Sequence, residues 1–292
     1  MKKNTSTLLR CAAFTGLSLG LATSLHASLI LNDPFATSTD FSNDWESASE
    51  ASWQSGTASW AGDSDYALAN AGGMVRVVGP QYNAGEWRSA QHDFGTALSG
   101  EFWVSMLIQA EDTTTGSGAV FALENGVFND RHADGFGIGI SGDGNLFTRE
   151  GGDPQPGVED TNVAIPQNGG WTLVVSKITV NGSGAADSID FWAFDDQSTF
   201  GLTEASLGSA LYSSSSVQYG DDVQDIWLGA YTISKNNQGK ANFDNIRISD
   251  LAGDAGLAEV LTTAAVPEPS TYALLLGGLA LTGVMLRRRR RG

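Results

Sequence analysis

Acidic side chains are the first residues that could do chemistry here, because the 292-residue chain carries 33 Asp and Glu but only 16 Lys and Arg. Enzymes that cleave glycosidic bonds need two carboxylates that flank one bond. The nearest candidate run, residues 187–192, has no glutamate and no third carboxylate at an interval that would bring it to the same face of a strand. We therefore predict no catalytic residues and a protein that is not an enzyme.

Eight tryptophans are the second candidates. An exposed aromatic ring can pack against a sugar ring while polar groups at its rim bind the hydroxyls. Three of these residues lie within strand-like patterns and are predicted to be core residues, namely Trp171, Trp192 and Trp227. A glycan-binding surface would have to use those in weaker patterns, and the candidates are Trp53, Trp60 and Trp87.

One oxygen-rich turn is a candidate calcium site, because Asp143 and Asn145 flank a glycine. Calcium takes about six to eight oxygen ligands, so two side chains alone do not specify it. Asp-Gly turns also connect strands in many proteins. Calcium therefore stays possible, and no cofactor is required. His92 and His132 are isolated and have no cysteine partner, which excludes the usual zinc pattern.

Short β-strands must position these candidates, since apolar residues alternate with polar ones between clusters of turn residues. Phe102, Val104, Met106 and Ile108 predict a strand with one strongly apolar face, and residues 135–140 alternate glycine with Phe or Ile. We expect residues 171–180 and 188–194 to form a hairpin, and residues 225–231 and 241–249 to form the closing pair. Further strands are predicted at residues 29–31, 74–78, 87–94 and 119–123.

This pattern predicts an all-β protein with two packed antiparallel sheets, a β-sandwich over residues 28–249. Residues 250–265, rich in Gly, Ala and Thr, are predicted to be a flexible spacer. The only cysteine, Cys11, lies near the amino terminus, so no disulfide can stabilise the sandwich. Its strongly acidic surface excludes nucleic acid as a partner, because phosphate binding needs clustered Lys and Arg.

The amino terminus has the features of a secretory signal peptide over residues 1–27. Lys2, Lys3 and Arg10 precede a short apolar stretch, which is followed by the small residue Ala27. We predict a signal helix that is cleaved between Ala27 and Ser28, so that the chain is exported.

The carboxyl terminus has the features of a second targeting segment, a short motif followed by an apolar run and a cluster of arginines. Residues 266–271 read Val-Pro-Glu-Pro-Ser-Thr, and an apolar run over 272–286 is followed by Arg287, Arg288, Arg289, Arg290 and Arg291. As a helix the run would be about 22 Å long, which is short for a hydrocarbon core of about 30 Å. The arginines would hold its far end in the cytoplasm. We predict a single transmembrane helix that holds the precursor in the membrane only for a time.

This order of motif, apolar helix and arginine cluster resembles the PEP-CTERM sorting signal of Gram-negative bacteria, here over residues 266–292. The resemblance implies that exosortase, a transpeptidase-like membrane protease, recognises Pro267, Glu268 and Pro269 and removes the tail. It also implies transient residence in the inner membrane, followed by release to the cell surface or an extracellular matrix.

The body resembles concanavalin A-like (laminin G-like) jelly rolls in three segments, residues 135–145, 171–192 and 241–248. Related glycosidases carry Glu-x-Asp-x-x-Glu on one strand, and no such run occurs here. The resemblance implies a non-catalytic module that binds glycans, with exopolysaccharide as the partner. A structural surface protein without a ligand and a glycosidase without a recognisable motif are the alternatives.

Overall fold

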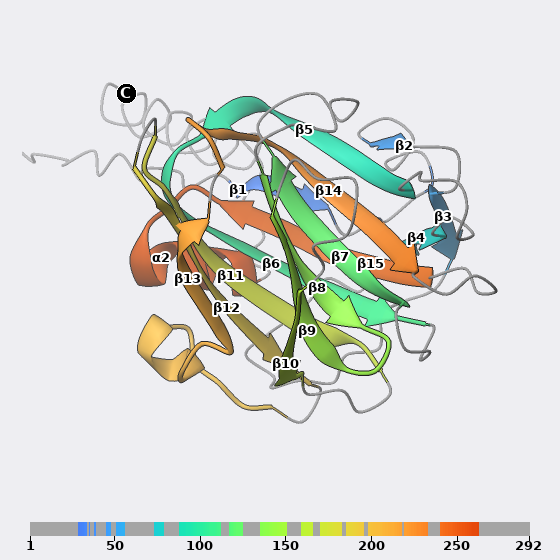
Figure 1. Cartoon of the computed structure of the whole chain (residues 1–292). Coiled ribbons are helices and arrows are strands. Elements are labelled where there is room, and N and C mark those ends of the chain that lie inside the picture. Colours follow the sequence, from blue (N-terminus) through green and yellow to red (C-terminus); the bar gives the residue numbers. More distant parts are fainter. Residues whose placement is uncertain are drawn as a thin grey trace, which may run out of the picture.

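Two antiparallel β-sheets pack face to face (Figure 1). The computed structural model describes residues 29–33, 35, 38, 45–47, 51–55, 73–78, 88–111, 117–124, 135–150, 159–165, 170–182, 185–195, 198–217, 219–232 and 240–262. The predicted signal peptide and sorting tail lie outside these residues. No helix within them is long and apolar enough to cross a membrane.

The eight-stranded sheet has the order β13-β12-β11-β6-β15-β4-β3, and β1 pairs with β15 beyond the end of β4. In that order the strands are Tyr212–Val217, Asp187–Phe194, Thr172–Val180, Gly100–Ala110, Lys240–Ser249, Gly73–Val78 and Ala51–Ser55, and β1 is Leu29–Asp33.

The seven-stranded sheet has the order β10-β9-β8-β7-β14-β5-β2. These strands are Glu159–Ala164, Asn145–Glu150, Gly135–Ser141, Ser117–Glu124, Val223–Thr232, Arg88–Leu98 and Glu46–Ser47. The predicted β-sandwich is thereby confirmed.

The predicted pairings are partly right. The hairpin of β11 and β12 is confirmed, with Val175 opposite Trp192. The expected closing pair is wrong, because β14 pairs with β5 and β7 in one sheet while β15 pairs with β1, β4 and β6 in the other. Strand patterns alone do not distinguish a hairpin from a connection that crosses between sheets.

The main core lies between the sheets. The predicted apolar face of β6 points into it, with Phe102, Val104, Met106 and Ile108 all buried. Phe136, Ile138 and Ile140 of β8 enter the same core from the opposite sheet, as their alternation with glycine predicts. Burying these apolar faces provides the main driving force for folding.

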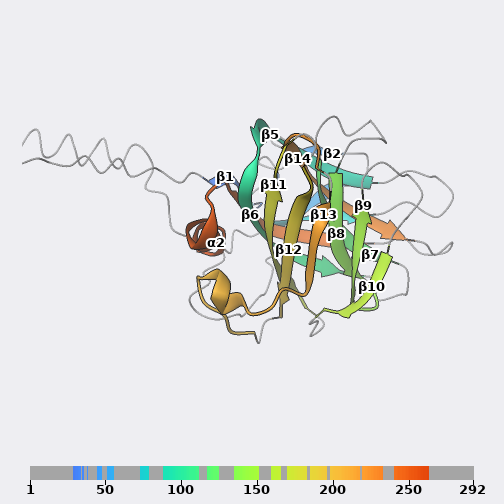
Figure 2. The same cartoon turned by 60° about the vertical axis from the view of Figure 1, so that its left-hand side comes forward.

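A second core covers part of the outer face of the eight-stranded sheet. Helix α2, Gly253–Leu261, covers this core and lies beside the 3₁₀ helix η1, Glu204–Leu207 (Figure 2). Leu257, Val260 and Leu261 are fully buried there against the outer side of β6, where Trp103 stacks on Trp192 with ring centroids 5.9 Å apart. The prediction of a flexible spacer over residues 250–265 is therefore wrong for residues 253–261.

Hydrogen bonds hold α2 at both of its ends. At its start, the Gly253 N–H donates to Glu101 Oε1 over 2.5 Å. At its end, the Val260 carbonyl accepts from Ser105 Oγ at 2.6 Å and from Arg247 Nη1 at 3.3 Å. A cation near the carboxyl end of a helix is favourable because the last carbonyls carry partial negative charge. Burial nevertheless lowers the pKa of Arg247 to about 10.

Candidate functional site

The candidate glycan-binding tryptophans have one member among the described residues. Trp53 on β3 is half-buried, and it packs against the main core. Its indole N–H donates to the Phe35 carbonyl over 2.9 Å, and Gly73 lies so close that an added Cβ would be 2.2 Å from Nε1. The polar edge of this ring is therefore occupied within the protein. Trp60 and Trp87 lie outside the described residues.

The three predicted core tryptophans are confirmed, since Trp171, Trp192 and Trp227 are all buried. They occupy two environments. Trp171 and Trp192 belong to the second core beneath α2, whereas Trp227 lies on the outer face of the seven-stranded sheet, where its ring covers Gly229 of the same strand.

The candidate calcium turn connects β8 to β9. The Gly144 N–H donates to the Ser141 carbonyl over 2.9 Å, with Gly144 in the left-handed region (φ 86°). The exposed Asp143 carboxylate accepts a hydrogen bond from the Ser141 hydroxyl, and the Asn145 N–H donates to the same hydroxyl over 3.0 Å. These contacts are those of an ordinary strand-connecting turn. Among the described residues, no group of three or more His, Cys, Asp or Glu could hold a metal ion.

The other predicted site residues lie outside the described residues. They are Ala27 and Ser28 at the expected signal cleavage point, Pro267, Glu268 and Pro269 of the sorting motif, and the arginines at 287–291.

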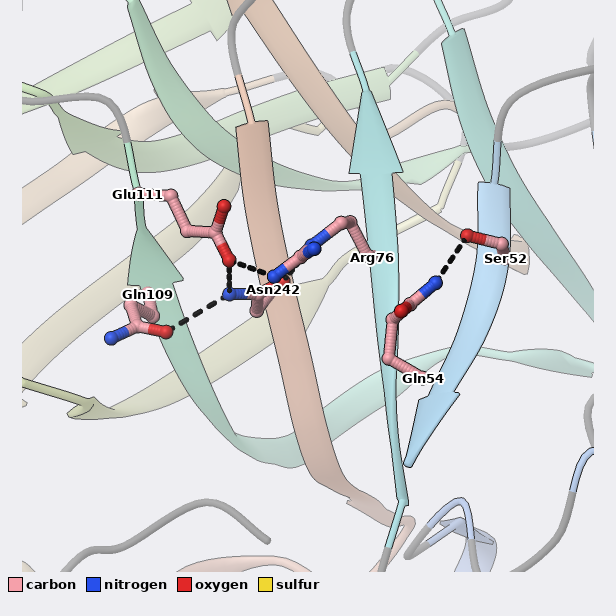
Figure 3. Close-up of polar contacts among 6 residues, drawn as sticks. All are labelled: Ser52, Gln54, Arg76, Gln109, Glu111 and Asn242. Atoms are coloured by element: carbon pink, nitrogen blue, oxygen red, sulfur yellow. Dashed lines mark hydrogen bonds and ion pairs between the residues drawn. The ribbon is translucent and has the colours of Figure 1, made fainter. Parts of the chain in front are cut away.

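A row of polar side chains crosses the outer face of the eight-stranded sheet, in the part that α2 does not cover (Figure 3). Ser52, Arg76, Asn242 and Gln109 stand directly opposite one another on β3, β4, β15 and β6. Gln54 lies two residues beyond Ser52 on β3, and Glu111 lies two residues beyond Gln109, just past the end of β6. We call these six residues the polar ladder. With strands about 4.8 Å apart, the row of four spans about 14 Å.

Hydrogen bonds arrange the middle of the polar ladder. Asn242 Nδ2 donates to Gln109 Oε1 at 2.9 Å and to Glu111 Oε1 at 2.8 Å. Asn242 Oδ1 accepts from Arg76 Nε at 3.1 Å, and the Arg76 guanidinium also pairs with the Glu111 carboxylate. At the β3 end, Gln54 Nε2 donates to Ser52 Oγ at 2.9 Å.

This surface is partly open to solvent, with Ser52 and Glu111 exposed and Gln54, Arg76 and Gln109 half-buried. Asn242 is buried, but the side chains of Arg76 and Glu111 are 31% and 26% exposed. Each amide offers two donors and an acceptor, and the guanidinium offers five donors. The polar ladder can therefore donate to and accept from the hydroxyl groups of a ligand. It contains no cysteine or histidine and no activated nucleophile.

Three acidic residues stand in register on the opposite side of the sandwich. Asp93 of β5 stands opposite Asp225 of β14, which in turn stands opposite Glu124 of β7. All three alternate with residues of the main core, so they belong to the outer face of the seven-stranded sheet. Asp225 is buried, Glu124 is half-buried and Asp93 is exposed. A motif search along one strand misses this arrangement, because each carboxylate comes from a different strand.

Comparisons with known proteins identify the carboxyl terminus. Residues 265–291 match the model of the PEP-CTERM protein-sorting motif. The motif indicates an exported protein that exosortase sorts, with a precursor anchored in the membrane. No curated protein matches the chain in sequence.

Solved structures resemble the sandwich at low sequence identity. Cellulose-induced protein Cip1 has a TM-score of 0.48 at 13% identity, over 76% of this chain and 99% of that one. The Bacillus licheniformis beta-glucanase has a TM-score of 0.44 at 10% identity, over 75% of this chain and 96% of that one. The carbohydrate recognition domain of Emp47p has a TM-score of 0.43 at 11% identity, over 71% of this chain and 88% of that one. No functional residue is carried over from these proteins.

Proposed function

We propose that this protein is a non-catalytic polysaccharide-binding module that acts at the cell surface or in the extracellular matrix of a Gram-negative bacterium. In this proposal exosortase recognises Pro267, Glu268 and Pro269, the signal peptide leaves between Ala27 and Ser28, and the released β-sandwich binds glycan through the polar ladder.

The polar ladder is the observation that carries this proposal. It presents donors and acceptors on a rigid sheet, and their own hydrogen bonds hold them in place before a ligand arrives. Such preorganisation lowers the entropy cost of binding. The chain is strongly acidic, with a net charge of −17, so a neutral polysaccharide suits this surface better than an anionic one.

Glycan-array binding by a protein comprising residues 28–262 tests the proposal. We expect Arg76→Met to weaken binding at least tenfold, because a hydrogen bond to a charged group contributes about 1.5 to 3 kcal/mol, and about 1.4 kcal/mol is tenfold. Gln109→Ala should weaken binding by a smaller factor.

Lys177→Met is the matched control. Lys177 is also a partly buried cation of the eight-stranded sheet, paired with Asp190 at 3.2 Å and with Glu204, but it lies outside the polar ladder. Equal loss of affinity in both methionine variants would exclude the ladder as the binding site. Absence of binding to every glycan would favour a structural surface protein without a ligand.

The carboxylate row favours a second candidate function, glycoside hydrolysis. Opposite positions on neighbouring strands bring side chains close together, and glycosidases use two carboxyl groups that flank one glycosidic bond. Release of reducing sugar from a polysaccharide panel, abolished by Asp225→Asn and by Glu124→Gln, would establish this function in place of the first.

A further inference from the structure

The last helix among the described residues ends just before the sorting motif. Helix α2 is buried along Leu257, Val260 and Leu261, and the Thr262 N–H closes it by donating to the Ala258 carbonyl over 2.9 Å. The matched motif begins at residue 265. The tail therefore leaves the sandwich from one defined place, the carboxyl end of α2.

The amino-terminal strand begins at the same place. Leu29 of β1 stands opposite Ser249 of β15 and packs against the second core beneath α2. The Ser249 hydroxyl donates to the Glu259 carboxylate in α2. Figure 2 shows β1 beside α2. Both ends of the exported domain thus lie at one end of the sandwich, which we call the α2 end.

The polar ladder lies at the opposite end of β15. Seven residues separate Asn242 from Ser249, which is about 24 Å along a strand. In Figure 1, α2 lies on the left of the sandwich and β3 and β4 lie on the right.

From this arrangement we infer that the α2 end is the surface of the folded domain that faces the inner membrane and the sorting enzyme, and that the polar ladder points away from both. Glu268 is six residues beyond Thr262, so the sorting motif is held within about 22 Å of α2. Ten residues join Thr262 to Tyr272, where the expected membrane segment begins, so the bilayer lies within about 36 Å.

The inference has a consequence for the precursor. A domain held by its α2 end keeps the polar ladder accessible before the tail is removed. Processing then releases a module that is already able to bind, instead of exposing a site that the membrane covered. The orientation rests on the proposed sorting of a precursor held in the membrane by its tail, and this consequence rests in addition on the proposed binding of glycan by the polar ladder.

Lipid-dependent quenching of the full-length precursor tests the orientation. Cys11→Ser removes the native thiol, and a single cysteine is then placed at Ala255 on the exposed side of α2 or at Lys240 at the start of β15. Both residues are exposed. Each variant is labelled with a fluorophore and reconstituted into phosphatidylcholine vesicles that contain quencher-labelled lipid.

We expect the label at residue 255 to be quenched at least twice as strongly as the label at residue 240. Insertion of 20 Gly and Ser residues after Thr262 should remove most of that difference, because the longer tether allows the domain to reorient. Equal quenching at both sites in the parent precursor, or stronger quenching at residue 240, would overturn the inference. Precursor that does not float with the vesicles would also overturn it, and glycan binding by residues 28–262 would be unaffected by either outcome.

Discussion

The loss of stability caused by Leu257→Ala tells whether residues 253–261 form a helix packed on the sheet or a flexible spacer. The Leu257 side chain is fully buried in the second core. Leu→Ala substitutions at such sites cost about 2 to 5 kcal/mol, because apolar contacts are lost and a cavity remains. In a domain of this size each kcal/mol lowers the melting temperature by about 2 to 4 °C, so Leu257→Ala should lower it by about 4 to 20 °C.

Thermal and urea unfolding of residues 28–262, followed by tryptophan fluorescence, measures this change. Leu257 packs in the same cluster as Trp103 and Trp192, so two of the tryptophans that contribute to the fluorescence lie beneath α2. Ala255→Ser is the control, because Ala255 is exposed on the same helix and such substitutions change stability by only about 0.5 kcal/mol. If the free energy of unfolding of Leu257→Ala lies within about 0.5 kcal/mol of the parent value, the packed helix is refuted and the flexible spacer is the better description.

Three further predictions concern other parts of the fold. Gly256→Ala should lower the free energy of unfolding by about 1 to 3 kcal/mol, although alanine is the better helix former. The reason is that an added Cβ would lie 2.0 Å from the Leu251 carbonyl oxygen and 2.7 Å from the Trp103 ring. A raised melting temperature would contradict this close packing. Burial raises the pKa of Tyr219, so its contribution to stability is present below the ordinary pKa of about 10 and is lost as the pH rises above that value. Tyr219→Phe should therefore gain stability relative to the parent above about pH 10, and parallel pH profiles of urea midpoints would count against this. Calcium in place of EDTA should leave the melting temperature unchanged, because Asp143 and Asn145 form an ordinary turn with Ser141; a rise that Asp143→Asn abolishes would show that the turn binds calcium.

Alternating patterns predicted the strands well because each half-buried strand shows its two faces in its own sequence. The apolar residues of β6 and β8 point into the main core as expected. The same reasoning underestimated β6, since Trp103 and Leu107 on its other face are buried as well.

Helix α2 could not be predicted from its composition. Nine residues are too few for a stable isolated helix, and Gly253 and Gly256 are typical of linkers. The helix forms because the second core buries its apolar face, so the information lies in the partner surface on β6 and β15. Gly256 illustrates the point, because it favours a spacer in the sequence but allows close contact with Trp103 in the fold.

The polar ladder and the carboxylate row depend on register between distant strands. Arg76 and Asn242 are 166 residues apart in sequence, yet they stand opposite each other and share a hydrogen bond. Asp93, Glu124 and Asp225 come from three separate strands. A single sequence contains each side chain, but the pairing that brings the side chains together appears only in the folded sheets.

A bulge in β15 separates the ladder from the α2 end. Phe243 and Ile246 both point into the main core although three residues apart, so the strand contains one residue more than strict alternation allows. Its register with β6 shifts between Asp244 and Arg247, and Asn245 takes the left-handed conformation (φ 52°). Before the bulge β15 pairs with β4 and carries Asn242; after it β15 pairs with β1 and places Arg247 beneath α2. Without the extra residue, Ile246 and Ile248 would turn outward and Arg247 inward, and the anchor of α2 would be lost. The bulge thus allows a single strand to hold the centre of the polar ladder at one end and the anchor of α2, which precedes the sorting tail, at the other.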